Sequence, residues 1–164
     1  MTRLYSFLKK EKQKNSGFTL IELIVVIIII STLAVISIPI IETSIKRERE
    51  LELKRNLRII REALDEYNSF VIKNKIKFDK DTYGYPEKLE ILVKGVEYRD
   101  KKNKARIKKF LRKIPYDPMT KSKDWGKRSY QDKRNSNHWG GENIWDIYSK
   151  SEKTALDGTK YSDW

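Results

Sequence analysis

An uncharged apolar run near the N-terminus constrains this chain more than any other stretch. Residues 17–41 have the sequence GFTLIELIVVIIIISTLAVISIPII, and the 19 residues 23–41 carry no charge. At about 1.5 Å rise per residue, a helix of that length spans the roughly 30 Å hydrocarbon core of a bilayer. The run therefore predicts a membrane-spanning helix in a chain that is otherwise strongly polar.

The composition limits what can be attached to this helix. The chain has 164 residues and no cysteine, which leaves room for one small head that is built without disulfides. Its net charge of +13 comes from 36 Lys and Arg against 23 Asp and Glu, and the basic residues occur along the whole length. Such a spread favours a solvated surface over a nucleic-acid site, where basic residues usually cluster. We therefore expect no nucleic-acid partner.

The segment before the apolar run is basic. Residues 1–17 contain five Lys and Arg against one Glu, which suits the anionic cytoplasmic surface of a membrane. Several basic residues also follow the run, between positions 46 and 61, so counting charges does not determine the orientation. An ordinary cleaved secretory signal fits poorly, because the run is too long and no A-x-A-like site follows it.

The N-terminal edge of the run carries a more specific motif. Residues 17–22, GFTLIE, resemble the class III signal of type IV pilins and of the pseudopilins of type II secretion systems. The resemblance implies that a prepilin peptidase cleaves between Gly17 and Phe18 on the cytoplasmic side, and that the new Phe18 amine is methylated. It also implies that residues 1–17 are a cytoplasmic leader, which settles the orientation.

Glu22 needs a partner on physical grounds, because a carboxylate at the margin of a membrane helix costs about 3 kcal/mol unless it is paired. In the resembled family, the glutamate at this place meets the amine of the first residue of a neighbouring subunit during assembly. Here the pair is Glu22 of one chain and Phe18 of the next. The alternative is a carboxylate that snorkels to the membrane interface.

Pro39 lies near the end of the apolar run, where it removes a helical N–H and clashes with the preceding turn. We expect a kink or local melting there. Pilins that resemble this chain carry a proline at the matching distance, and the helix around it is thought to unfold when subunits pack into a filament. The alternative is a proline that is tolerated at a bend in lipid, with no functional consequence.

The pattern becomes amphipathic between residues 43 and 73. Apolar residues recur there at spacings of four and three, which places them on one stripe of a helix. The stripe consists of Leu53, Leu57, Ile60, Leu64, Tyr67 and Val71. A free coiled coil could use the same stripe, but aromatic residues downstream also need partners. We therefore expect the stripe to pack against the chain's own C-terminal head.

The head begins with a loop over residues 78–85. A short helix follows, with Pro86 at its first position and Gly95 just past its end. Residues 96–113 are rich in Lys and Arg. They predict an exposed connection with a helical turn, anchored by apolar residues. These anchors are Ile107, Phe110 and Leu111.

The last forty residues predict short strands and turns. Alternating strand formers over residues 144–148 and a shorter run over 159–161 indicate strands, separated by an Asp157-Gly158 turn. The aromatic Trp164 is expected to pack back under the sheet.

Residues 115–118, Pro-Tyr-Asp-Pro, predict a rigid turn. They resemble a Pro-x-Asp-Pro motif of the major pseudopilins of type II secretion, often called pseudopilin G, in which a small antiparallel sheet follows. The Trp-Gly pair that usually follows the motif is displaced here to Trp125-Gly126, so we expect the local turn to differ.

Together these features predict an α+β pilin fold in which one long helix packs against a small head with a short helix and a small antiparallel sheet. The predicted segments are a cleaved leader over 1–17, a transmembrane and assembly helix over 18–41, its amphipathic extension over 42–75, and an extracytoplasmic head over 76–164.

Residues 149–163, which we call the C-terminal loop, resemble the loop that holds calcium in pseudopilin G. Calcium takes six to eight oxygen ligands from carboxylates and backbone carbonyls. The resemblance implies Asp157 and Asp163 as carboxylate ligands, with backbone oxygens near Leu156. Three lysines in the loop oppose a divalent cation, and the alternative is an Asp-Gly turn held by hydrogen bonds alone.

No catalytic arrangement is present in the sequence. It contains no Ser-His-Asp pattern in a strand and helix context, no phosphate-binding glycine loop and no metal-ligand histidine spacing. We therefore expect a structural protein and not an enzyme.

The resemblance implies a pseudopilus subunit of type II secretion that drives protein export. Such a subunit crosses the inner membrane once, with its head in the periplasm or outside the cell. It polymerises into a helical filament and works with the prepilin peptidase, the inner-membrane platform and minor pseudopilins.

Two other functions stay open. A type IV pilus subunit for adhesion, motility or DNA uptake would share residues 17–60, although the Pro-x-Asp-Pro motif and the lack of a Cys pair argue against it. The second is an uncleaved membrane protein with one span, whose basic head binds an acidic partner or nucleic acid.

Overall fold

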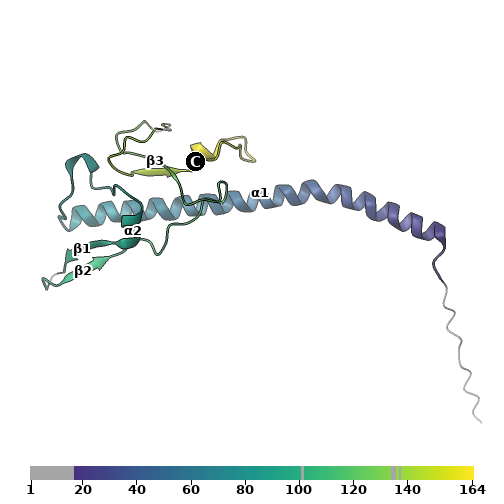
Figure 1. Cartoon of the computed structure of the whole chain (residues 1–164), viewed down its shortest axis with the longest axis horizontal. Helices are drawn as coiled ribbons and strands as arrows, with labels where there is room; N and C mark the ends of the chain where they lie inside the picture. Colours follow the sequence, from purple (N-terminus) through teal and green to yellow (C-terminus); the bar gives the residue numbers. More distant parts are fainter. Residues whose placement is uncertain (1–16, 101, 134–135, 137) are drawn as a thin grey trace, which may run out of the picture. The chain divides into compact units, whose positions relative to one another are not determined.

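The computed structural model describes residues 17–100, 102–133, 136 and 138–164, and within them the side chains of residues 36–40 are not described. The chain divides into two compact units, Met1–Glu42 and Thr43–Trp164. The elements along the chain are α1 (Leu20–Lys73), the 3-10 helix η1 (Lys80–Thr82), α2 (Glu90–Lys94), β1 (Val96–Arg99), β2 (Ala105–Lys108), β3 (Gly126–Arg128), β4 (Asp146–Tyr148) and the 3-10 helix η2 (Tyr161–Asp163) (Figure 1). The predicted combination of one long N-terminal helix with a small mixed head is confirmed.

The C-terminal half of α1 carries the core of the head. Leu53, Ile60 and Leu64 are fully buried, and Leu57 and Val71 nearly so, which confirms the predicted stripe. The stripe is covered by side chains of the head. They include Leu89, Leu92, Leu111, Trp125, Ile144, Ile147, Ala155 and Tyr161. The chain therefore supplies its own cover for this half of the helix.

The lysine-rich segment after α2 is a hairpin, so the prediction of an exposed connection with a helical turn is wrong. β1 pairs with β2 in antiparallel register, with Val96 opposite Lys108 and Arg99 opposite Ala105. Alternation along β1 turns Tyr98 toward α1, where its ring centroid lies 5.0 Å from that of Phe70. This contact joins the hairpin to a distant residue of α1, which no local pattern reveals.

The hairpin turn and its anchors show what the local pattern missed. The Asp100 carboxylate accepts the N–H groups of Lys102 and Lys104 at 2.8 and 3.0 Å, which closes the turn. These bonds, above all the one from Lys104, lower the pKa of Asp100. Phe110 packs against the core as expected, whereas Ile107 is 59% exposed and does not belong to the core.

The short helix begins later than predicted. α2 starts at Glu90, and the carbonyl of Pro86 instead accepts the N–H of Ile144 at 2.8 Å. Its C-terminal end is as expected, because Gly95 follows it directly. Gly95 has φ +89°, and a Cβ there would lie 2.5 Å from the carbonyl oxygen of Lys108. The close approach of α2 to β2 therefore requires glycine.

β3 and β4 form a second two-stranded antiparallel sheet, in which Gly126 lies opposite Tyr148. The predicted strand over 144–148 is thus confirmed for its last three residues. The predicted strand over 159–161 is wrong, because Lys160 only forms an isolated bridge with Thr154 and Tyr161 begins η2. Figure 1 shows β1 and β2 on one side of the C-terminal half of α1, and β3 on the other.

Candidate functional site: the N-terminal segment and the C-terminal loop

Thr19 caps the N-terminus of α1. Its hydroxyl accepts the N–H of Glu22 at 3.2 Å, and its carbonyl accepts the N–H of Leu23 at 3.1 Å. Thr-x-x-Glu is the spacing of a capping box, in which the first residue ends the non-helical chain and the fourth lies in the first turn. The helix therefore begins just after the predicted cleavage bond.

The two residues of the predicted cleavage site precede the helix. Gly17 and Phe18 have no regular secondary structure, and the Phe18 side chain is 81% exposed. A Cβ built on Gly17 would have no described atom within 4 Å. A bond in exposed chain outside a helix suits proteolysis. The predicted leader is described only at Gly17, because residues 1–16 lie outside the described residues.

Glu22 is exposed on the first turn of α1. An acidic side chain there is stabilised by the positive end of the helix dipole. Its position in the capping pattern gives it a local structural role that the sequence analysis missed, although the Thr-x-x-Glu spacing could have revealed it. Its docking to the amine of a neighbouring Phe18 stays a prediction.

The apolar side chains that follow are exposed. Between residues 18 and 35, the large apolar side chains range from 41% exposed at Val26 to 81% at Phe18. An unbroken apolar sequence over residues 23–30 puts such side chains on every face of the helix. A helix that is apolar all round is normally buried in lipid or among other helices.

The predicted membrane span and the predicted kink at Pro39 both remain predictions. No helix in the described part of the chain reaches the length and apolarity of a membrane span. Pro39 is one of residues 36–40, whose side chains lie outside the description. Its kink or melting therefore remains a prediction.

The predicted calcium residues lie in the C-terminal loop, and Asp157 makes local hydrogen bonds there. Its Oδ1 accepts the N–H of Thr159 at 3.0 Å and the hydroxyl of Thr159 at 2.6 Å. These two bonds, the hydroxyl first, lower the pKa of Asp157, and the positive charge of Lys54 adds to the effect. Gly158 has φ +85°, as an Asp-Gly turn requires.

The other two predicted ligands make different contacts. Asp163 is exposed, and its Oδ1 accepts the hydroxyl of Ser162 at 3.4 Å. The Leu156 N–H donates to Glu50 of α1 at 2.8 Å. Across the described residues, no three His, Cys, Asp or Glu side chains gather where they could hold a metal. In this arrangement the residues do not fit a calcium cage, and calcium binding stays a prediction.

The Pro-x-Asp-Pro turn is tied to two distant elements. Asp117 is fully buried, and its carboxylate accepts the N–H of Met119 at 2.7 Å and the hydroxyl of Ser149 at 2.6 Å. The carbonyl of Tyr116 accepts the side-chain amide of Asn56, on α1, at 2.8 Å. The turn therefore joins α1 to the chain that leaves β4.

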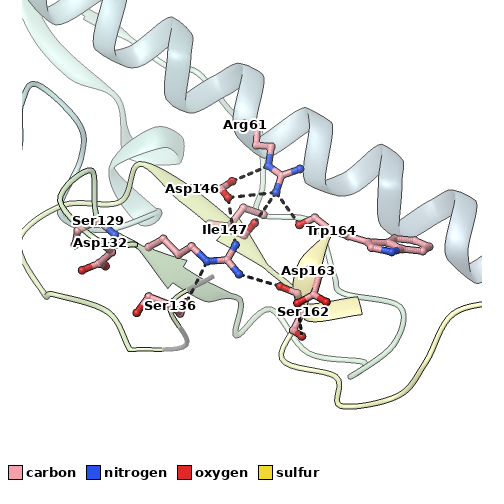
Figure 2. Close-up of polar contacts among 10 residues, drawn as sticks. Arg61, Ser129, Asp132, Ser136, Asp146, Ile147, Ser162, Asp163 and Trp164 are labelled. Carbon is pink, nitrogen blue, oxygen red and sulfur yellow. Dashed lines mark hydrogen bonds and ion pairs between the residues drawn. The ribbon is translucent and has the colours of Figure 1, made fainter. Parts of the chain in front are cut away.

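Two arginines share the carboxylate of Asp146 beside the C-terminal loop. Figure 2 labels one of them, Arg61, together with Asp146. Arg61 of α1 donates to both oxygens of Asp146, at 2.6 and 3.4 Å. Arg128 of β3 donates to one of these oxygens at 3.3 Å, and its side chain is only 5% exposed. The sequence analysis missed this network because Arg61 and Asp146 are 85 residues apart, which no local spacing indicates.

Known proteins share the N-terminal feature. Among protein families, the prokaryotic N-terminal methylation motif matches residues 12–38. The chain carries an N-terminal methylation motif. It is also 29% identical to the type II secretion system core protein G of Pseudomonas aeruginosa over 111 residues, which cover 66% of this chain and 70% of that protein. No solved structure matches.

The two matches confirm the resemblance to type IV pilin-like proteins, and to pseudopilin G in particular, that residues 17–22 and 115–118 predicted. The methylation motif covers the proposed cleavage bond and Glu22.

Proposed function

We propose that this protein is a structural subunit of a type II secretion pseudopilus. It is made as a precursor, cleaved by a prepilin peptidase between Gly17 and Phe18, and methylated at the Phe18 amine. One observation carries the proposal: an exposed helix that is apolar on every side begins immediately after that bond, within a methylation motif. A soluble monomer rarely leaves such a surface uncovered.

In this proposal, the apolar helix over residues 18–41 is buried in two different surroundings, one before assembly and one after it. Before assembly the inner membrane covers it as a single span, with the head in the periplasm or outside the cell. After assembly the helices of neighbouring copies cover it in the core of a helical filament, and Pro39 marks the place where the helix melts. The platform in the inner membrane and minor pseudopilins are the expected partners. The similarity to a secretion system core protein supports this choice over a pilus.

Glu22 has two separable roles in this proposal. Its position in the cap of α1 helps to start the helix, and its charge sets register against the Phe18 amine of the next subunit. The cap bond is donated by the main-chain N–H of residue 22 to the Thr19 hydroxyl, and glutamine keeps that N–H. Glutamine is also a normal residue at the fourth position of a capping box. Glu22→Gln therefore keeps the cap and removes the charge.

The test measures processing and assembly separately in cells that carry the secretion system. We expect Glu22→Gln to show normal maturation, seen by mass spectrometry as loss of residues 1–17 plus one methyl group. We expect it to yield few or no filaments by electron microscopy. The matched control is Glu52→Gln, at an exposed glutamate of the same helix, which should assemble normally.

Two results would contradict the proposal in different ways. Normal filaments from Glu22→Gln would remove the register role of the charge. A wild-type chain that keeps residues 1–17 in the membrane fraction would exclude pilin-type maturation and favour an uncleaved membrane protein with a basic binding head.

A further inference from the structure

A buried glutamate of α1 ties both ends of the Asp-Gly turn to the helix. Glu50 is 9% exposed, and its Oε1 accepts the N–H of Leu156 and the hydroxyl of Tyr161, each at 2.8 Å. Tyr161 is itself 1% exposed. A buried carboxylate is tolerated when hydrogen-bond donors satisfy it. Here both donors come from the C-terminal loop, so the loop is the partner that Glu50 requires.

Two arginines hold the end of the chain through main-chain oxygens. Arg61 donates to the main-chain oxygen of Trp164 at 2.8 Å, and Arg128 donates to that of Ser162 at 2.9 Å. Figure 2 shows the Arg61 guanidinium group between Asp146 and Trp164. Main-chain oxygens of a wrapping loop are typical calcium ligands. In this chain, guanidinium groups bind the main-chain oxygen of Ser162, which is in the loop, and that of Trp164, which directly follows it.

The protein's own side chains place positive charge beside the C-terminal loop. In addition to Arg61 and Arg128, Lys54 contributes. The ammonium group of Lys54 lies 4.2 Å from the centroid of the Trp164 ring, and its charge also acts on Asp157. The Trp164 indole N–H in turn donates to the hydroxyl of Thr159 at 2.7 Å, which closes the loop on itself. A divalent cation placed here would meet this positive field and would have to displace the existing hydrogen bonds of Asp157.

We propose that the C-terminal loop is a metal-independent clasp, ordered by Glu50 and Arg61 of α1 and by Arg128 of β3. The head then folds with the same stability in the presence and in the absence of calcium. This arrangement differs from the calcium loop that the resemblance to pseudopilin G implies. The proposal rests on contacts within residues 43–164 and is independent of the function proposed above.

The first test uses the wild-type full chain in detergent. All four tryptophans lie in the unit that contains the clasp, so their fluorescence reports its thermal unfolding. We expect the same Tm, within about 1 °C, in excess CaCl2 and in excess EGTA. A calcium-dependent rise of about 5 °C or more, which a saturated site would produce, would overturn the proposal.

The second test removes one arm of the clasp. Arg61→Gln removes the guanidinium donor from the main-chain oxygen of Trp164 and leaves Asp146 with Arg128 as its guanidinium partner. We expect amide hydrogen exchange in residues 150–163 to accelerate about tenfold, while exchange in the β1–β2 hairpin is unchanged. Arg61→Lys keeps the charge but not the fork of donors, and should restore part of the protection.

The matched control is Arg58→Gln, at an exposed arginine one turn earlier on α1, which should leave loop exchange unchanged. If amide hydrogen exchange in residues 150–163 is as slow in Arg61→Gln as in the wild-type chain, the proposed clasp is contradicted. If Arg61→Gln does not fold, the calcium measurement on the wild-type chain decides the question by itself.

Discussion

The two halves of α1 share a helical backbone and differ in how their apolar side chains are covered. Before residue 36 the large apolar side chains are exposed on every face, whereas from Leu53 onward one stripe is buried and most of the exposed side chains are polar. Helical propensity and capping act locally and form both halves. Within the described residues, only the striped half finds its cover in the same chain. In the function proposed above, the membrane and then neighbouring copies cover the other half.

Polar side chains show the same contrast. In the first half, the hydroxyls of Ser31 and Thr32 donate to carbonyls of the preceding turn of the helix, at 2.7 and 2.8 Å. In the second half, Asn56 and Glu50 reach partners that are 60 and up to 111 residues away. These polar side chains of the first half therefore bond within the helix itself, whereas those of the second half bond to distant parts of the head.

The largest expected effect on stability comes from comparing one alanine substitution in each half of α1. Leu64→Ala, at a fully buried position, should lower the free energy of unfolding of the head by about 2–5 kcal/mol, because it leaves a cavity. Ile28→Ala, at a position that is 57% exposed, should leave that value unchanged and reduce filament yield. Urea titrations followed by tryptophan fluorescence measure the first quantity. Equal destabilisation by both changes would break the contrast.

A smaller effect is expected at the Pro-x-Asp-Pro turn. Asp117→Ala leaves the Met119 N–H and the Ser149 hydroxyl without their acceptor, which should cost about 1–3 kcal/mol of stability. The control is Asp124→Ala, which breaks an exposed ion pair with Lys150 and should cost no more than about 1 kcal/mol. The same urea titration compares them. If both variants lose the same free energy of unfolding, the buried turn does not stabilise the head more than an exposed ion pair does.

The smallest effect concerns pH. Burial raises the pKa of Tyr161 to about 12, and the hydrogen bond and charge of Glu50 add to the shift. An unfolded tyrosine ionises near pH ~10. Since the folded pKa is the higher one, the contribution of Tyr161 to stability is complete below pH ~10 and is lost as the pH rises toward about 12.

Tyr161→Phe tests this shift, because it removes the ionisable hydroxyl. The stability of the wild-type chain should fall more steeply than that of Tyr161→Phe above pH ~10. Chemical denaturation at a series of pH values measures both slopes. Parallel curves would show that Tyr161 ionises normally in the folded state.

The amphipathic stripe and the N-terminal motif could be predicted from the sequence, because each depends on residues that are close together along the chain. The stripe from Leu53 to Val71 follows from the helical period, and the motif over residues 17–22 is contiguous. The hairpin over residues 96–108 could not be predicted in this way, because Tyr98 is placed by Phe70 of α1. The start of α2 was also misplaced, since Pro86 has the geometry of a first helical residue but its carbonyl pairs with Ile144.

The sequence by itself determined the apolar run, the motif over residues 17–22 and the amphipathic stripe, because each depends on side chains that are neighbours along a chain or a helix. Tertiary structure alone decided how the C-terminal loop is held. Asp146 brings Arg61 and Arg128 together only after the sheet packs on α1, and the main-chain oxygens of Ser162 and Trp164 then become their acceptors. Burial and donor geometry, which arise from packing, decide which groups hold this loop.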